Sequence, residues 1–303
     1  MGTRLAALMA AATLTVVACS QTAPDGGVVG SSCGGRVVEV VASVDQWGDI
    51  AQQLGGECAQ VTTAVANSSI DPHDFEPTPS DLAAFDEADL VVVNGAGYDA
   101  WASGVVEALP AQPDVVDAAV VNRVSAGANP HLWYSPEYVA ETARAITRQL
   151  SAQSPDAAGY FAARQAAWTE SMRPYYAEIA RIRKQAAGKP FGATEPLFDY
   201  MADALGLVNR TPAGYRRSSA NEGEPSPGDL KDFKAALEGH QMAVLIFNSQ
   251  VSGAVPEMIE RDAREASVPV VAVTETVVPG ASSFADWQVS QLRALAGALG
   301  VRG

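Results

Sequence analysis

The chain has 303 residues, of which 48% are hydrophobic and 18% are charged, and its mean hydropathy is +0.03. These values are typical of a globular protein and exclude a disordered or collagen-like chain, and the length predicts two domains or one large one. Lys and Arg together number 20 against 35 Asp and Glu, which gives a formal net charge of −15. A surface this acidic repels phosphate backbones, so we expect no nucleic-acid partner, whereas cations are attracted to it.

Residues 1–18 have the features of an export signal peptide. A single charge, Arg4, precedes an apolar stretch that is shorter than the roughly 20 residues of a membrane-spanning helix. The stretch ends in Val16-Val17-Ala18-Cys19, which resembles a bacterial lipobox, where cleavage before the cysteine leaves a thiol that is lipidated. We therefore expect an extracytoplasmic protein, held by a lipid on Cys19 to the outer face of the bacterial cell membrane, with residues 19–35 as a Gly-rich tether. An ordinary cleaved signal with an incidental Cys19 is the alternative.

Two further cysteines, Cys33 and Cys58, each stand just before a β-rich run. If the two runs are adjacent parallel strands, their starts lie close together, so a disulfide is expected in an oxidising compartment. Two unpaired thiols are the alternative.

Strand-like and helix-like segments alternate in both halves of the chain, which favours parallel α/β sheets. Ser/Thr-Pro pairs at Thr78, Ser135 and Ser226 predict helix starts, because the hydroxyl can cap the helix and proline fits its first position. The apolar, β-branched runs that predict strands are 37–42, 61–66, 90–93 and 115–121 in the first half, and 190–194, 243–247 and 268–273 in the second.

An Ala-rich and charge-rich segment, residues 156–187, separates the two halves and shows helical periodicity throughout. A helix of that length spans nearly 50 Å, and Pro174 is expected to kink it without ending it. The predicted fold is therefore two parallel-sheet α/β lobes, residues 36–155 and 188–303, joined by one long interdomain helix.

No Gly-rich phosphate loop and no nucleophile motif occurs in the sequence, so no enzyme class is indicated. Of the three histidines, His240 stands at an apparent helix end and is interpreted as a surface residue. His73 and His131 lie in Pro-containing loops, and Glu195 and Glu275 stand just after predicted strands. Loops at the carboxyl ends of parallel strands bind ligands in α/β folds, so these four side chains form a candidate site for a divalent transition metal. Structural roles for each of them are the alternative reading.

The sequence also resembles a known family, the solute-binding lipoproteins of zinc and manganese ABC importers, also called helical-backbone metal receptors. The similarity covers roughly residues 36–300. Its most specific part is Asp71-Pro72-His73-Asp74-Phe75-Glu76-Pro77, which resembles the family's first ligand loop, and Asn129-Pro130-His131-Leu132-Trp133 resembles the second. Thr194-Glu195-Pro196 and Thr274-Glu275-Thr276 resemble the third and fourth, although most members carry Asp at the position of Glu275.

The resemblance implies that the four residues His73, His131, Glu195 and Glu275 ligate Zn²⁺ or Mn²⁺ as the transported ion. It also implies delivery to an ABC permease and its ATPase, a metal site in the cleft between the lobes, and no enzymatic activity; a monomer is expected. Glu195 and the absence of a His-rich loop at residues 122–130 lean towards manganese, but the metal stays open. The alternatives are a zinc-dependent extracytoplasmic hydrolase and a cell-adhesion protein in which the metal is structural.

Overall fold

The computed structural model describes residues 1–2, 33–66, 75–221 and 223–302. The proposed lipidation site Cys19, most of the signal peptide and the proposed ligand His73 lie outside these ranges. Within them, no helix combines the length and the apolar character that crossing a membrane requires.

The N-terminal lobe is built on a four-stranded parallel sheet with strand order β2-β1-β3-β4. Three of the strands match the predicted runs, but the run 115–121 does not continue as a strand. Strand β4 ends at Asp117, whose carboxylate accepts a hydrogen bond from the Val120 N–H and begins a short helix. The strands are β1 (Val38–Val44), β2 (Ala59–Val65), β3 (Leu90–Val93) and β4 (Asp114–Asp117), and the helices are α1 (Asp45–Gly55), α2 (Pro79–Glu87), α3 (Ala100–Ala108), α4 (Ala118–Val121) and α5 (Pro136–Gln153).

The C-terminal lobe repeats this plan with strand order β6-β5-β7-β8, again parallel throughout. Strand β6 was not predicted, because its two residues are too few to produce a sequence pattern. The strands are β5 (Pro190–Ala193), β6 (Val208–Asn209), β7 (Val244–Asn248) and β8 (Val270–Val273), and the helices are α8 (Asp199–Leu205), α9 (Ala213–Ala220), α10 (Pro227–Glu238), α11 (Ala254–Glu265) and α12 (Phe284–Ala298). The described residues also form four single 3₁₀ turns, at Gly56–Cys58, Leu132–Tyr134, Pro155–Ala157 and Pro196–Phe198.

The three Ser/Thr-Pro pairs begin helices as the sequence predicts. At the start of α2, the Thr78 hydroxyl accepts from the Asp81 N–H, and the Asp81 carboxylate accepts from the Thr78 N–H. The same reciprocal capping box begins α10 at Ser226, and the Ser135 hydroxyl caps α5. Each cap satisfies backbone donors that have no partner inside the helix, and so fixes where the preceding loop ends.

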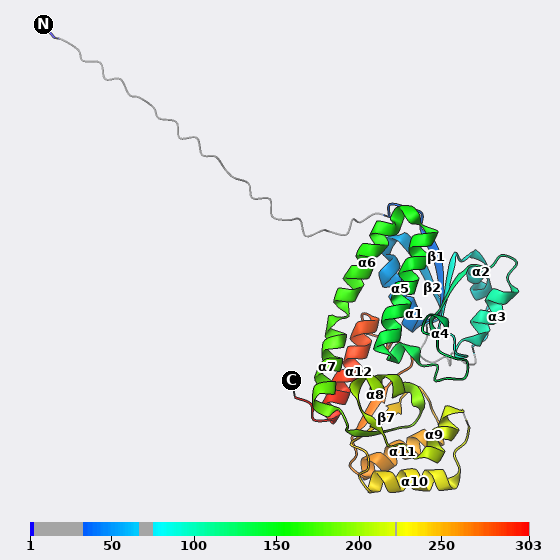
Figure 1. Ribbon diagram of the computed structural model, residues 1–303, viewed down its shortest axis with the longest axis vertical. Coiled ribbons are helices and arrows are strands. Elements are labelled where there is room, and N and C mark those ends of the chain that lie inside the picture. Colours follow the sequence, from blue (N-terminus) through cyan, green and yellow to red (C-terminus); the bar gives the residue numbers. More distant parts are fainter. Residues whose placement is uncertain (3–32, 67–74, 222, 303) are drawn as a thin grey trace.

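The segment between the lobes is helical but is divided in two. Helix α6 (Ala158–Ser171) and helix α7 (Arg173–Ala186) are separated by the single residue Met172, and together they run along one side of the molecule from one lobe to the other (Figure 1). The break lies two residues before Pro174, which has no N–H to donate to the preceding turn. The expected single helix over 156–187 is thus two consecutive helices.

One hydrophobic core extends through both lobes, from Val38 in β1 to Leu299 beyond α12. At the boundary, the rings of Tyr134 and Trp287 lie 6.1 Å apart between centroids, and those of Tyr175 and Phe284 lie 6.4 Å apart. Because interiors are close-packed, such a shared core resists large independent movements of the lobes.

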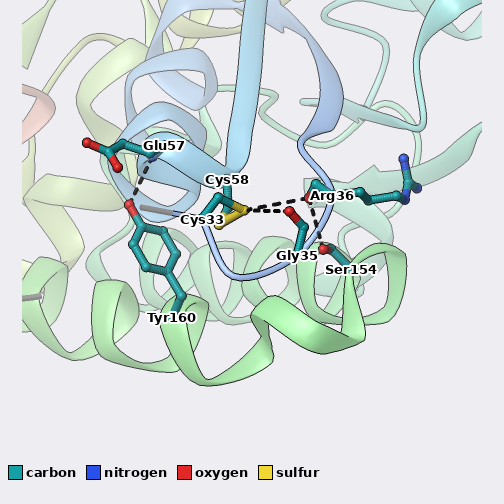
Figure 2. Close-up of a disulfide and its surroundings, with 7 residues drawn as sticks. All are labelled: Cys33, Gly35, Arg36, Glu57, Cys58, Ser154 and Tyr160. Carbon is teal, nitrogen blue, oxygen red and sulfur yellow. Dashed lines mark hydrogen bonds between the residues drawn. A yellow bond between two sulfur atoms is a disulfide. The ribbon is translucent and has the colours of Figure 1, made fainter. Parts of the chain in front are cut away.

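A disulfide joins Cys33 and Cys58, with an S–S distance of 2.11 Å and a Cα–Cα distance of 5.0 Å (Figure 2). The two cysteines precede β1 and β2, which pair in parallel with Val38 opposite Ala59. Beside the disulfide, the Glu57 N–H donates to the Tyr160 hydroxyl of α6 at 2.9 Å. These bonds tie the start of the N-terminal sheet to the first half of the linking segment.

Candidate metal site between the lobes

Three of the four proposed ligands line the same cavity, which has a volume of about 390 Å³. His131 enters it from the N-terminal lobe, and Glu195 and Glu275 enter it from the C-terminal lobe. Its other lining side chains include the phenol of Tyr215, the carboxylate of Glu224 and several apolar groups. The strand-end loops of the two lobes therefore face one another, as the sequence predicts.

The His131 ring is oriented by its near neighbour Asn129. His131 Nδ1 lies 2.7 Å from Asn129 Oδ1, and the His131 backbone N–H donates to the same oxygen at 3.1 Å. Asn129 Nδ2 donates to the Pro196 carbonyl at 2.7 Å, which fixes the orientation of the amide. Since the amide oxygen can only accept, Nδ1 carries the proton and Nε2 keeps the lone pair that a metal requires.

The loop before His131 is held by buried groups that follow strand β3. Asn94 is fully buried, accepts from Trp47 Nε1 at 3.0 Å, and donates to the Pro130 carbonyl at 2.8 Å. The Asp99 carboxylate accepts from the Asn94 and Gly95 N–H groups and from the Ser43 hydroxyl. Burial raises the pKa of Asp99 above its ordinary value, which these hydrogen bonds partly offset.

Glu195 lies two residues beyond the end of strand β5 and immediately before the 3₁₀ turn Pro196–Phe198. The carbonyl of the preceding Thr194 accepts from the Tyr215 hydroxyl at 2.9 Å and from Ser219 Oγ at 3.0 Å, both within the C-terminal lobe. Burial, followed by the charge of Glu195, raises the pKa of Tyr215, which therefore remains a neutral donor. The backbone that presents Glu195 is thus supported from its own lobe.

The Glu275 carboxylate receives hydrogen bonds from both lobes. Its Oε1 accepts from Asn248 Nδ2, at the end of β7, and its Oε2 accepts from the Tyr98 hydroxyl of the N-terminal lobe, each at 2.8 Å. Burial raises the pKa of Tyr98 well above its ordinary value, and the charge of Glu275 raises it further, so the phenol stays protonated and donates. The longer side chain that distinguishes Glu275 from Asp is therefore held at both oxygens.

The donor set suits a divalent transition metal, since it combines an imidazole nitrogen with carboxylate oxygens. Among the residues that the structure describes, however, no three His, Cys, Asp or Glu side chains form a group that could hold a metal ion. The cavity therefore brings His131, Glu195 and Glu275 into one space without forming a coordination shell from them.

The positioning residues Asn94, Tyr98 and Asn248 were not predicted. Asn94 and Asn248 each stand at the end of an apolar run, which is the same signal that singled out Glu195 and Glu275. No such signal exists for Tyr98, which lies in the loop before α3 and meets Glu275 only through the tertiary structure.

Comparison with known proteins places the chain in a family. A model of the zinc-uptake complex component A, periplasmic (ZnuA), matches residues 40–298. The high-affinity zinc uptake system protein ZnuA of Bacillus subtilis is 24% identical over 271 residues, which are 83% of this chain and 82% of that protein. The manganese ABC transporter substrate-binding lipoprotein PsaA of Streptococcus pneumoniae is 26% identical over 288 residues, or 90% of this chain and 88% of that protein.

Solved structures show the same fold. FpvC from Pseudomonas aeruginosa, in complex with Mn²⁺, gives a TM-score of 0.73 at 21% identity, covering 88% of this chain and all of that one. The Mn-bound periplasmic metal-binding protein from Candidatus Liberibacter asiaticus gives 0.70 at 18% identity and covers 87% of this chain and 99% of that one. With a family model that spans nearly all of both lobes, the chain belongs to the family of the periplasmic zinc-uptake component ZnuA, whose members are substrate-binding proteins of metal transport.

Proposed function

We propose that this protein binds a divalent transition metal ion, Zn²⁺ or Mn²⁺, outside the cytoplasmic membrane and delivers it to the permease of an ABC importer. Relatives named for zinc and for manganese both cover more than four fifths of the chain, so they support the metal class without choosing between the two ions. A lipid on Cys19 would keep the protein beside its permease and the associated ATPase. Several relatives are named as lipoproteins, which supports the anchor.

The observation that carries the proposal is the shared cavity. His131 presents an Nε2 lone pair there, fixed by the bond to Asn129, and Glu195 and Glu275 supply carboxylates from the opposite lobe. His73 is proposed as the fourth ligand on the sequence resemblance alone. We expect the ion to draw these side chains together, because the Glu275 carboxylate exchanges protein donors for a stronger cationic partner.

A receptor role is favoured over a hydrolase by the ligand set. A hydrolytic zinc site keeps one position open for water, whereas two imidazoles and two carboxylates fill four positions. The proposed lobes, 36–155 and 188–303, would then enclose the ion until the permease receives it.

The test is competitive titration of chelator-treated protein with Zn²⁺ and with Mn²⁺, for the wild type, His131→Asn and Glu195→Gln. We expect one equivalent of metal for the wild type and an affinity lower by at least about a hundredfold in His131→Asn, since a ligand is lost. His240→Asn is the matched control, because His240 is exposed and its positive φ of 48° is one that Asn tolerates.

Equal affinities for His131→Asn and His240→Asn would remove His131 from the site. Absence of any stoichiometric metal binding by the wild type would end the proposal. Hydrolytic activity that needs both metal and His131 would replace it with the enzyme alternative.

A further inference from the structure

The loop that carries Glu275 is fastened to the other lobe at both of its ends. It runs from the end of β8 to Phe284, the first residue of α12, and meets helix α1 of the N-terminal lobe. At the near end, Gln46 Nε2 donates to the Glu275 carbonyl at 2.5 Å, and Asp45 Oδ2 accepts from the Val277 N–H at 3.1 Å. At the far end, Asp49 Oδ2 accepts from the Phe284 N–H at 2.8 Å.

These contacts depend on the first five residues of one helix. Helix α1 begins at Asp45, directly after strand β1, so the central sheet of the N-terminal lobe fixes where it starts. Asp45 and Asp49 are four residues apart and therefore lie on one face of α1, one turn above the other. Gln46 is fully buried beside them. All three side chains bind backbone groups, so they fix the path of the loop whatever side chains the loop carries.

Asp49 also completes the start of a helix in the other lobe. The first N–H groups of a helix have no partner inside it, and they form its positive end. The cap of α12 itself, Ser283, accepts from the Asp286 N–H, whereas the Phe284 N–H is satisfied by Asp49 of α1. A carboxylate that bonds a helix N-terminus is a charge-assisted contact, which is stronger than one between neutral groups.

We propose that Asp45, Gln46 and Asp49 form a latch that holds the Glu275 loop against the N-terminal lobe, and that this latch sets the residence time of the bound metal ion. The inference rests on the proposed function. None of the three side chains lines the cavity, so they are positioning residues that act through Glu275.

Residence time is the property that the latch controls, because Glu275 lies on the loop that it fastens. Strand β8 is at the edge of its sheet. Beyond Val273, Gln291 and Gln250 hold the loop from its own lobe, where their Oε1 atoms accept from the backbone N–H groups of residues 274–276, and α1 holds it from the other lobe. If the loop detaches, Glu275 moves away from Tyr98 and the ion loses a ligand. Capture by His131 and Glu195 needs none of these contacts, so the association rate should change little.

The test compares Asp49→Ala with Asp49→Asn. Alanine removes the acceptor, whereas asparagine keeps an oxygen that accepts from the Phe284 N–H and removes only the charge. Gln52→Ala is the control on the same helix, because Gln52 is exposed. The measurements are the rates of Zn²⁺ association and of Zn²⁺ dissociation into excess chelator, together with hydrogen exchange of residues 276–286 in metal-free protein.

For Asp49→Ala we expect dissociation about tenfold faster, with the association rate changed less than about twofold, since one charge-assisted bond is lost. Exchange at Phe284 should accelerate, and Asp49→Asn should retain most of the wild-type behaviour. Asp45→Ala, which removes the bond to Val277, is the second variant if Asp49→Ala does not fold.

An unchanged Zn²⁺ dissociation rate in both Asp49→Ala and Asp45→Ala would overturn the latch. Equal effects of Asp49→Ala and Asp49→Asn would also overturn it, because the effect would then come from the lost charge alone and not from the lost hydrogen-bond acceptor. Hydrogen exchange separates this inference from the proposed function. If the wild type binds no metal, the proposed function fails. If hydrogen exchange at Val277 and Phe284 is the same in the Asp45→Ala and Asp49→Ala variants as in the wild type, the latch contacts themselves are absent.

Discussion

His131 and Glu275 occupy the same cavity but are positioned in different ways. The partner that orients the His131 ring, Asn129, stands two residues away in the same loop. The groups that hold Glu275 include Tyr98, 177 residues away, and Gln46, 229 residues away, both in the opposite lobe. The direct partner of the imidazole thus comes from its own loop, whereas one of the two direct donors to the carboxylate comes from the opposite lobe.

This difference indicates which half of the site can change during metal release. A small shift between the lobes separates Glu275 from Tyr98 directly, whereas it reaches the bond between His131 and Asn129 only through the contact of Asn129 with the Pro196 carbonyl. Because the hydrophobic core is shared across the boundary, wide opening of the two lobes is disfavoured. We therefore expect metal release to occur by movement of the Glu275 loop.

The largest expected effect is a change in the free energy of unfolding, caused by Asp45, which forms one of the bonds across the boundary between the lobes. Burial, with a smaller contribution from the charge of Asp49, raises the pKa of Asp45 from 3.8 to about 7. An acid whose pKa is raised by folding stabilises the fold fully below its unfolded pKa, and this stability is lost as the pH rises through the folded pKa. Asp45→Asn has no such loss, so its free energy of unfolding should exceed that of the wild type by roughly 2–4 kcal/mol at pH 8.

Urea unfolding from pH 4 to pH 8 checks this expectation, with Glu57→Gln, an exposed carboxylate just beyond α1, as the control. The difference between Asp45→Asn and wild type should grow between pH 4 and pH 7 and then level off. A difference that does not depend on pH would show that Asp45 is not held as a buried acid at the boundary.

The next effect tests the locally positioned half of the site. Asn129→Ala removes the acceptor that fixes the His131 tautomer, and the loss of such a partner lowers metal affinity by about 10–100-fold. Asn129→Asp retains an oxygen opposite Nδ1 and should recover most of the affinity. Competitive titration with Zn²⁺ measures both variants, and equal weakening in the two would show that the amide acts through its bond to the Pro196 carbonyl instead.

The smallest effect is expected at Tyr98. Tyr98→Phe removes one donor from Glu275, but Asn248 still holds the other oxygen, so affinity should fall only about fivefold, as for one hydrogen bond. The same titration checks this, with the dissociation rate expected to account for the change. Tighter Zn²⁺ binding by Tyr98→Phe would mean that the phenol competes with the metal for Glu275 Oε2. The contact across the boundary would then weaken metal binding and not support it.

The sequence predicts what is local in this molecule. Alternating apolar runs and the Ser/Thr-Pro caps indicate both lobes, because a cap needs only neighbouring residues such as Thr78 and Asp81. The exceptions are equally local in origin: Asp117 caps α4 within an apolar run, and α6 and α7 are separated just before Pro174. A strand of two residues, such as β6, is below the length at which a pattern exists.

For the site, strand ends identify Glu195 and Glu275, and the Pro-containing loop identifies His131. The groups of the opposite lobe that hold Glu275 could not be predicted, because Tyr98 and Gln46 reach it only after two lobes have folded and packed together. Nothing in their own neighbourhood distinguishes them from core residues.

The most direct test of the central claim is a crystal structure of the metal-loaded protein, with anomalous scattering recorded at the zinc or manganese edge. We predict one strong peak per chain in the cavity between the lobes, within coordination distance of His131 Nε2 and of the Glu195 and Glu275 carboxylates. A peak elsewhere, or no peak in a protein shown to be loaded, would contradict the assignment of this cavity as the metal site.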